Sequence, residues 1–287
     1  MPVRPVLAWP SVVALFAEYA VIAVCFAAAS WAWNPVVVAL AFVVIATRQH
    51  ALFILYHDAV HGLFARSLRV NDLLVNLFVG VPLLVPVHVY RALHLTHHAH
   101  LGTPRDPERV LLYRGQLWAY RPLPLVRLAA QLAGDASGVF GLRMLAAYVQ
   151  ERRDPASTLE LPVVRVFPET WALLAAWLGA LAALAWVDLG LFARFALLWF
   201  VPFLTVVQAI QKVRSFAEHD HPDATERSYT WRPGLLGRLV VWPYNIGYHR
   251  EHHVYPTLPW FVLPSVGEPD GRPGSALVGL LWNGRLR

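Results

Sequence analysis

Residues 35–61 read PVVVALAFVVIATRQHALFILYHDAVH, an apolar run that ends in two histidines four positions apart. The part from 35 to 56 has the roughly 20 mostly apolar residues that a helix needs to cross a bilayer. Positions i and i+4 of a helix share one face, so His57 and His61 can point at one spot. Because neutral imidazole is a common metal ligand, the stretch predicts a membrane helix that ends at a metal-binding face.

Three further runs, 8–31, 170–187 and 190–211, are apolar enough to span a membrane. The composition agrees, since 57% of residues are hydrophobic and 15% are charged, against about 25% charged in a typical soluble domain. The first run is longer than the apolar core of a cleavable signal. We therefore predict an all-α integral membrane protein with four transmembrane helices.

The distribution of basic residues predicts the orientation. The connectors at 34–35 and 188–190 lack Lys and Arg, whereas arginines are concentrated at the other helix ends. The positive-inside rule then places both termini on the cytoplasmic side, and all three histidine clusters with them as a cytoplasmic cap. The net charge of +6 suits anionic lipid headgroups or an acidic protein partner. Nucleic acid is disfavoured as a partner, because the arginines lie mostly at membrane edges.

Residues 73–89 are apolar but only about 17 long, and they contain Gly80, Pro82 and Pro86. A single crossing here would put the first two histidine clusters in opposite compartments. We predict a short re-entrant hairpin or a segment that lies at the interface.

Residues 114–150 mix apolar residues with scattered arginines and predict an interfacial amphipathic helix, interrupted early by Pro122 and Pro124. An ordinary cytoplasmic helix is the alternative. Residues 151–168 are predicted to form a surface loop. The sequence has no internal repeat and no separable soluble domain, so residues 1–287 are predicted to form one membrane-embedded domain.

Two more histidine clusters read HLTHH at 94–98 and HREHH at 249–253. Neighbours such as His97 and His98 project about 100° apart on a helix, so they serve two adjacent ions better than one. Eight imidazoles in three clusters are too many for one ion and about right for two. Interfacial histidines that are merely hydrogen-bonded are the alternative, but three spaced clusters on one predicted side favour a dinuclear centre.

The three motifs resemble the histidine boxes of the membrane fatty acid desaturase and hydroxylase superfamily. The flanking sequences HAHLGTPRDP from His98, RSFAEH from Arg214 to His219 ahead of the third box, and VYP from Val254 are similar as well. The resemblance covers roughly 45–265 and is specific for the superfamily but not for the substrate. The pattern around the third box also resembles carotenoid ketolases and hydroxylases.

The resemblance implies two irons held almost wholly by imidazole. Asn245, expected one helical turn before His249, would hold a metal-bound water in some members; a hydrogen-bonded interfacial residue is the alternative. Metal-bound imidazoles usually donate their second N–H to a carboxylate. The carboxylates close enough in sequence to do so, if they are not simply solvated, are Asp58, Asp106, Glu108, Glu218 and Glu251. The implied histidine ligands are His57, His61, His94, His97, His98, His219, His249, His252 and His253.

Iron follows mainly from the resemblance, because imidazole also suits zinc and copper. Structural zinc sites usually include cysteine, and the His-Glu-x-x-His pattern of zinc proteases does not occur in the sequence. Cys25 is the only cysteine, which excludes an intrachain disulfide and argues against an intrinsic Cys-ligated iron–sulfur cluster.

By the resemblance, a di-iron centre would use O2 to break an unactivated C–H bond. The leading interpretation is a desaturase that introduces a double bond into a fatty acyl chain or acyl lipid. A hydroxylase or ketolase of a fatty acyl or carotenoid/isoprenoid chain is the alternative. The sequence shows no flavin fingerprint or cytochrome domain, so electrons would come from an external ferredoxin-like or cytochrome-like donor. We predict no catalytic residue beyond the metal ligands and no organic cofactor.

Two alternative hypotheses assign the protein to a class other than oxygenases, namely a metal transporter or a bis-histidine haem protein. Transport favours ionisable residues along the membrane interior, where this chain has few, namely Glu18, Arg48 and Arg194. Haem would favour histidines at mid-depth. Because the histidines follow the apolar runs, both readings are disfavoured.

Overall fold

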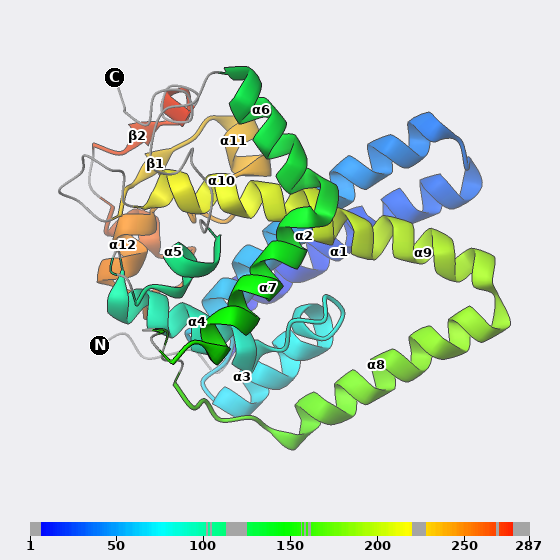
Figure 1. The fold of residues 1–287 in the computed structure, drawn as a ribbon, viewed down its shortest axis with the longest axis horizontal. Helices are drawn as coiled ribbons and strands as arrows, with labels where there is room; N and C mark the ends of the chain where they lie inside the picture. The colour runs from blue at the N-terminus through cyan, green and yellow to red at the C-terminus, as the bar shows by residue number, and fades with distance from the viewer. Residues whose placement is uncertain are drawn as a thin grey trace. The chain divides into compact units, whose positions relative to one another are not determined.

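The computed structural model describes residues 7–101, 103, 105–112, 125–155, 157, 159, 162–219, 228–267 and 270–277. The described chain is mostly helical (Figure 1). It forms two compact units, each of two segments: unit one is Met1–Arg91 with Val164–Val207, and unit two is Ala92–Val163 with Gln208–Arg287. We describe each unit by itself.

Unit one begins with an antiparallel helix pair, α1 (Trp9–Trp31) and α2 (Pro35–Val60), which lie side by side in Figure 1. The side chain of Asn34 caps α2 by accepting hydrogen bonds from Val36 N and Val37 N, both at 3.1 Å. Proline at the first position of α2 has no N–H that needs a partner. The tight break predicted here is confirmed, and α2 runs on to Val60 rather than ending at 56.

The second pair in unit one is α8 (Pro168–Val187) and α9 (Leu189–Pro202), joined at Asp188, whose side chain accepts a hydrogen bond from Leu191 N at 2.9 Å. A π-helical turn, η4 (Phe203–Val207), follows α9 without a break. Among the described residues, four helices are long and apolar enough to cross a membrane: Trp9–Trp31, Pro35–Val60, Pro168–Val187 and Leu189–Glu218.

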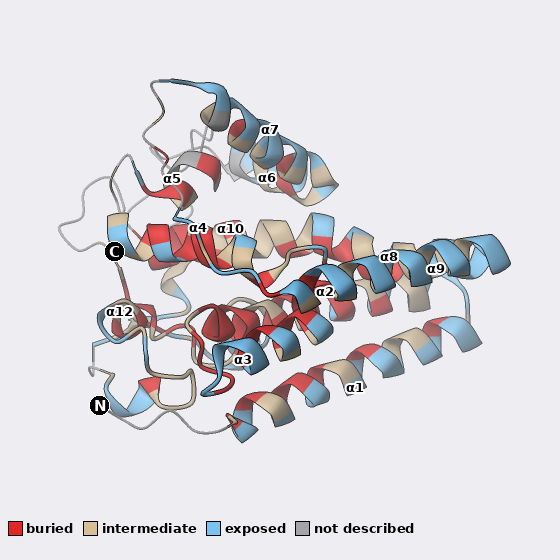
Figure 2. Ribbon diagram, turned by 90° about the horizontal axis from the view of Figure 1, so that it is seen from below, coloured by how far each residue is buried: buried red, intermediate tan, exposed pale blue. Residues whose placement is uncertain are grey.

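Exposed residues cover much of α8 and α9 in Figure 2. Many are large and apolar, and Trp186 is 91% exposed and Val187 81% exposed. Large apolar side chains exposed in this way are unfavourable in water but are stable in contact with lipid. The chain is therefore an integral, multi-pass membrane protein, as predicted.

Two polar contacts link the helices of unit one at membrane depth. Arg48 Nη1 lies 3.2 Å from Glu18 Oε2 and pairs α2 with α1. Gln49 Nε2 donates to the carbonyl of Trp199 at 2.7 Å and joins α2 to α9. Each contact pairs a polar side chain within helices apolar enough to cross a membrane, where polar groups need partners inside the protein.

Residues 73–89 form a helix, a turn and the start of another helix. Helix α3 (Leu68–Val75) continues into the π-helical η1 (Asn76–Gly80), and α4 (Val87–His100) begins after a turn. Gly80 allows the close approach, since a Cβ there would lie 2.6 Å from the hydroxyl of Tyr56 and 3.0 Å from the carbonyl of Val85. None of these elements reaches the length of a membrane span, in line with the predicted short hairpin.

Unit two holds the later residues of α4 and a set of mostly short elements. The helices that follow are α5 (Pro107–Leu112), α6 (Leu125–Gly134), the π-helical η3 (Asp135–Val139), α7 (Phe140–Arg153) and α10 (Gln208–Glu218). The last elements are β1 (Trp231–Arg232), α11 (Leu235–Val240), α12 (His249–Val254), the 3-10 helix η5 (Leu263–Ser265) and β2 (Arg272–Pro273). The two strands pair in parallel over two residues each, a small addition to an otherwise helical fold.

The predicted interfacial helix over 114–150 corresponds to α6, η3 and α7, and α7 extends to Arg153. Its first part, including Pro122 and Pro124, lies outside the described residues. Apolar Leu142 and Leu145 of α7 are 70% and 59% exposed, which is typical of a helix that contacts lipid headgroups. On the inner side, Lys212 Nζ of α10 pairs with Asp135 Oδ2 at 2.7 Å.

Candidate metal centre

The second and third histidine clusters lie on two helices of unit two. Residues 94–98 belong to the last turns of α4, and residues 249–253 form most of α12. His219 directly follows α10 and forms an isolated bridge with Ser228. All seven histidines of these segments are buried or half-buried.

One group of four imidazoles brings together His97, His219, His249 and His253. Their ligand nitrogens all lie within 4.8 Å of one another. His219 Nε2 lies 3.1 Å from His97 Nε2 and 3.0 Å from His249 Nε2. The Nε2 atoms of His249 and His253 are 3.1 Å apart. Four nitrogens from α4, α12 and the end of α10 thus converge on one point.

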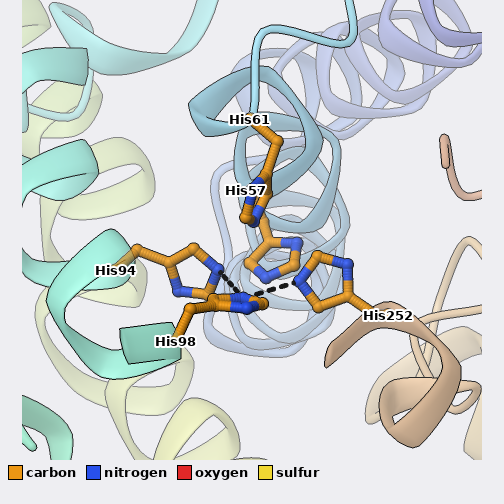
Figure 3. Close-up of side chains that lie close together, drawn as sticks. All are labelled: His57, His61, His94, His98 and His252. Atoms are coloured by element: carbon orange, nitrogen blue, oxygen red, sulfur yellow. Dashed lines mark hydrogen bonds between the residues drawn. The ribbon is translucent and has the colours of Figure 1, made fainter. Parts of the chain in front are cut away.

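A second group in unit two contains His94, His98 and His252. His98 Nε2 lies 2.9 Å from His94 Nε2 and 3.0 Å from His252 Nε2, the two contacts dashed in Figure 3. Adjacent residues of α4 and of α12 therefore belong to different groups. This is the division between two ions that the His97-His98 and His252-His253 pairs predict.

The nitrogen spacings suit metal coordination. Two imidazole nitrogens at right angles around an ion, each about 2.1 Å from it, would be about 3.0 Å apart. The observed 2.9–3.1 Å separations match this value. The donor set is wholly nitrogen, which iron, zinc and copper accept. The residues present therefore fit a pair of such metal ions.

His57 and His61 belong to unit one. His57 lies on the last turn of α2, and His61 is the residue that ends this helix. Their ring centroids are 5.6 Å apart, so the two imidazoles form a pair, which Figure 3 also draws. This neighbouring position is what the i, i+4 spacing predicts.

Two predicted carboxylates contact imidazoles of the first group. His97 Nδ1 and Asp106 Oδ1 are 2.9 Å apart and buried. Glu218 Oε2 lies 3.4 Å from His249 Nδ1, and the side chain of Glu218 is fully buried. Asp106 is placed to accept the N–H on the far side of the His97 ring and so to fix the direction of its Nε2, whereas Glu218 lies at an ion-pair distance from His249.

The other three predicted carboxylates have different surroundings. Glu108 Oε2 accepts a hydrogen bond from Ser215 Oγ at 2.8 Å. Glu251 Oε2 accepts one from Thr230 Oγ1 at 2.6 Å. Asp58 is buried in unit one, with its Oδ1 4.0 Å from His57 Nδ1. Glu108 and Glu251 are thus held by hydroxyl groups.

The electrostatics of the first group favour a bound cation. Burial alone would lower the pKa of His97, but the carboxylates of Glu108 and Asp106 outweigh it and raise the pKa overall. Burial, with the neighbouring His219, lowers the pKa of His249 well below its usual range. The lowered pKa favours the neutral form of His249, which is the form that binds metal, while the carboxylates attract positive charge to His97.

Sequence reasoning did not single out Arg214, Ser215 and Thr230. Arg214 Nη1 donates to Glu218 Oε2, one turn further along α10. The i, i+4 spacing of these opposite charges was a signal for this pair. The contacts of Ser215 and Thr230 join residues far apart in the sequence, so no local pattern indicates them.

Asn245 is not on a helix with His249, because α12 begins only at His249. Its backbone is left-handed, with φ 55°, and its Nδ2 donates to the carbonyl of Trp260 at 3.3 Å. The expectation that it lies one helical turn before His249 is wrong, because residues 244 and 245 form a turn there.

We expect Asp106→Asn to lower metal affinity or turnover by about 10- to 100-fold, because the variant keeps the shape of the side chain but removes its negative charge. Metal content and initial rate measured on the same preparation would show the loss. Asp154→Asn, at the exposed end of α7, is the matched control and should change neither. Equal values for Asp106→Asn and the unmodified protein would remove Asp106 from this role.

Comparison with known proteins gives the following matches. The family model described as fatty acid desaturase matches residues 31–273. A dihydrorhizobitoxine desaturase from Bradyrhizobium elkanii is 29% identical over 93% of the chain and 77% of its own length. A chloroplastic omega-3 fatty acid desaturase from Glycine max is 31% identical over 84% of the chain, which spans only 56% of that relative.

Other relatives differ in their reaction or name an electron donor. A beta-carotene ketolase from Paracoccus sp. (strain PC1) is 27% identical over 77% of the chain and 75% of its own length. Acyl-lipid omega-3 desaturases with ferredoxin in their names, from Helianthus annuus and Synechocystis, also match.

Proposed function

Because the chain belongs to the fatty acid desaturase family, and is therefore a membrane oxidoreductase, we propose that it is an O2-dependent di-iron desaturase of a fatty acyl chain or acyl lipid. The observation that carries this proposal is the pair of imidazole groups in unit two, with neighbouring residues of α4 and α12 divided between them. A helix face built for one ion would not use adjacent histidines in this way.

We propose two ligand sets. His97, His219, His249 and His253 would hold one iron. His94, His98 and His252 would hold the other, completed by His57 and His61. Asn245 would act through a bound water. When bound, an iron pair would supply the redox chemistry by which O2, with electrons from the external donor, becomes an oxidant able to remove hydrogen from an unactivated C–H bond. Asp106 and Glu218 orient the rings of His97 and His249.

The exposed apolar helices support a lipid substrate. Such a substrate already resides in the bilayer that α1, α2, α8 and α9 would cross. A fatty acyl chain or acyl lipid could therefore reach the enzyme without passing through water. The whole chain would act as one membrane-embedded catalytic domain.

Electrons would come from a separate protein. The names of two relatives support a ferredoxin-like donor, and a cytochrome-like donor is the alternative. The net charge of +6 suits an acidic donor. We propose that the histidine-bearing helix ends and both termini face the cytoplasm, where such a donor would dock.

One observation favours a second candidate reaction. The relative named as a beta-carotene ketolase covers more than three-quarters of the chain, so the same scaffold can insert oxygen. Whether hydrogen removal or oxygen insertion follows depends on where the second C–H bond lies, and errors of about 1 Å matter greatly to such steps. A hydroxylase or ketolase of a fatty acyl or isoprenoid chain is therefore the alternative.

Lipid mass spectrometry of cells with and without the protein tests the proposal. Desaturation should give acyl products lighter by two hydrogens, whereas hydroxylation or ketolation adds oxygen. Cells that express His97→Ala provide the background. Oxygenated products alone would replace the desaturase proposal with the alternative, and lipid profiles identical to that background would contradict both.

A further inference from the structure

We propose that Arg91, Asp72 and Asn71 form a clamp that positions His57 and His61 for metal binding. The three side chains belong to unit one and surround the end of α2. Their role toward the metal rests on the proposed function. They are positioning residues, because they act through the backbone of α2 and do not touch the reacting atoms.

The clamp satisfies the last carbonyls of α2. Arg91, on the first turns of α4, donates from Nε to the carbonyl of Val60 at 2.9 Å and from Nη2 to that of Ala59 at 3.2 Å. Asn71 Nδ2 also donates to the carbonyl of Ala59, at 2.9 Å. The last four carbonyls of a helix have no partner within the helix, so Arg91 gives the carbonyl of Val60 a donor, and Arg91 and Asn71 add to the hydrogen bond that the carbonyl of Ala59 accepts from Gly62 N at 2.9 Å. The positive charge at the carboxyl end also matches the helix dipole.

A buried carboxylate fixes the arginine. Arg91 Nη1 and Nη2 donate to the two oxygens of Asp72 at 2.7 and 2.6 Å. Arg91 and Asp72 are 6% and 2% exposed. This paired geometry requires the planar guanidinium, and a lysine cannot reproduce it.

Asn71 extends the clamp beyond the end of the helix. Its Oδ1 accepts a hydrogen bond from Phe64 N at 3.0 Å, and it is fully buried. The chain between Ala59 and Phe64 turns at Gly62, where φ is 74°. The same side chain therefore holds both ends of the segment that contains His61.

The direction of His61 depends on these contacts. His61 ends α2, so helical hydrogen bonding fixes it on one side only. Burying an ion pair costs desolvation energy. Apolar residues of similar volume in its place often stabilise a fold as well as the ion pair does, or better. An ion pair that contacts the backbone beside two candidate ligands is therefore better explained by precise placement than by stability.

Titration of the metal-free protein with Co2+ tests the proposal, because absorption bands of bound Co2+ report each coordination sphere separately from activity. In Arg91→Lys we expect one of two Co2+ sites to weaken by about 10- to 100-fold, the usual effect of losing an outer contact to a ligand, while the other keeps its affinity. Arg91→Met combined with Asp72→Leu leaves no unpaired buried charge. It should remain folded by thermal melting and weaken the same site.

The matched control is Arg48→Lys, which disturbs the ion pair with Glu18 on the same α2 without contacting the helix end. It should leave both Co2+ sites unchanged. Two sites of unchanged affinity in Arg91→Lys and in the double variant would overturn the clamp, as would an equal loss in Arg48→Lys. An unmodified protein that binds two metals but yields no oxidised lipid would refute the proposed function and leave the clamp result standing.

Discussion

His97→Ala and His253→Ala should each abolish product formation and lower the bound metal. Both rings supply an Nε2 to the group of four in unit two. Alanine leaves three imidazoles there and a gap in a buried site, and the part of the chain that the structure describes offers no further histidine in that group. Metal content of the purified variants and product yield in cells are the two measurements.

His88→Ala is the matched control for these variants. It removes a histidine from the same helix α4, but His88 belongs to neither imidazole group, and its ring lies 5.5 Å from that of Trp171 at an interplanar angle of 57°. It should keep both metals and most of the activity. Full turnover in His97→Ala or His253→Ala would take that residue out of the ligand set.

Removing the metals should have an equally large effect. A chelator should reduce turnover to background, and Fe2+ should restore it. Zn2+ should compete for the imidazoles but restore nothing, because it has no redox chemistry. The measurement is the product yield after chelation and again after each metal is added. Folding should be followed in parallel, so that loss of metal is not confused with loss of structure.

Turnover that survives complete chelation, or that zinc restores, would contradict the di-iron proposal. Restoration by Fe2+ alone would support it. Loss of activity with an unchanged melting profile would show that the metals act in the chemistry rather than in folding.

The membrane helices could be predicted because bilayer thickness imposes one length on them. The runs at 8–31 and 170–187 agree with α1 and α8 to within two residues at each end. The last span was predicted too short, since the helix continues through η4 and α10 to Glu218. The polar residue Lys212 conceals this continuation, because it is buried against Asp135, a partner far away in the sequence that no local pattern indicates.

The imidazole groups could also be anticipated, because helical geometry alone divides His97 from His98. Asp106 was a natural candidate, since it lies nine residues from the ring that it contacts. The clamp at the end of α2 was not predictable in this way. Arg91 and Asp72 are separated by a turn whose path depends on the left-handed backbone of Leu84, with φ 59°, and on the close contact at Gly80.

Leu189 to Glu218 form one continuous helix. The apolar residues at its start and Glu218 at its end therefore keep a fixed rotation relative to each other about the helix axis. Inserting or deleting a single residue in its apolar half would turn Glu218 and the following His219 by about 100° and shift them by about 1.5 Å. Apolar residues that face only lipid can therefore be substituted by other apolar residues, but a single insertion or deletion among them is not tolerated. The wider π-helical turn at η4 is part of this fixed register, since its i→i+5 hydrogen bonding already differs from that of the α-helix on either side.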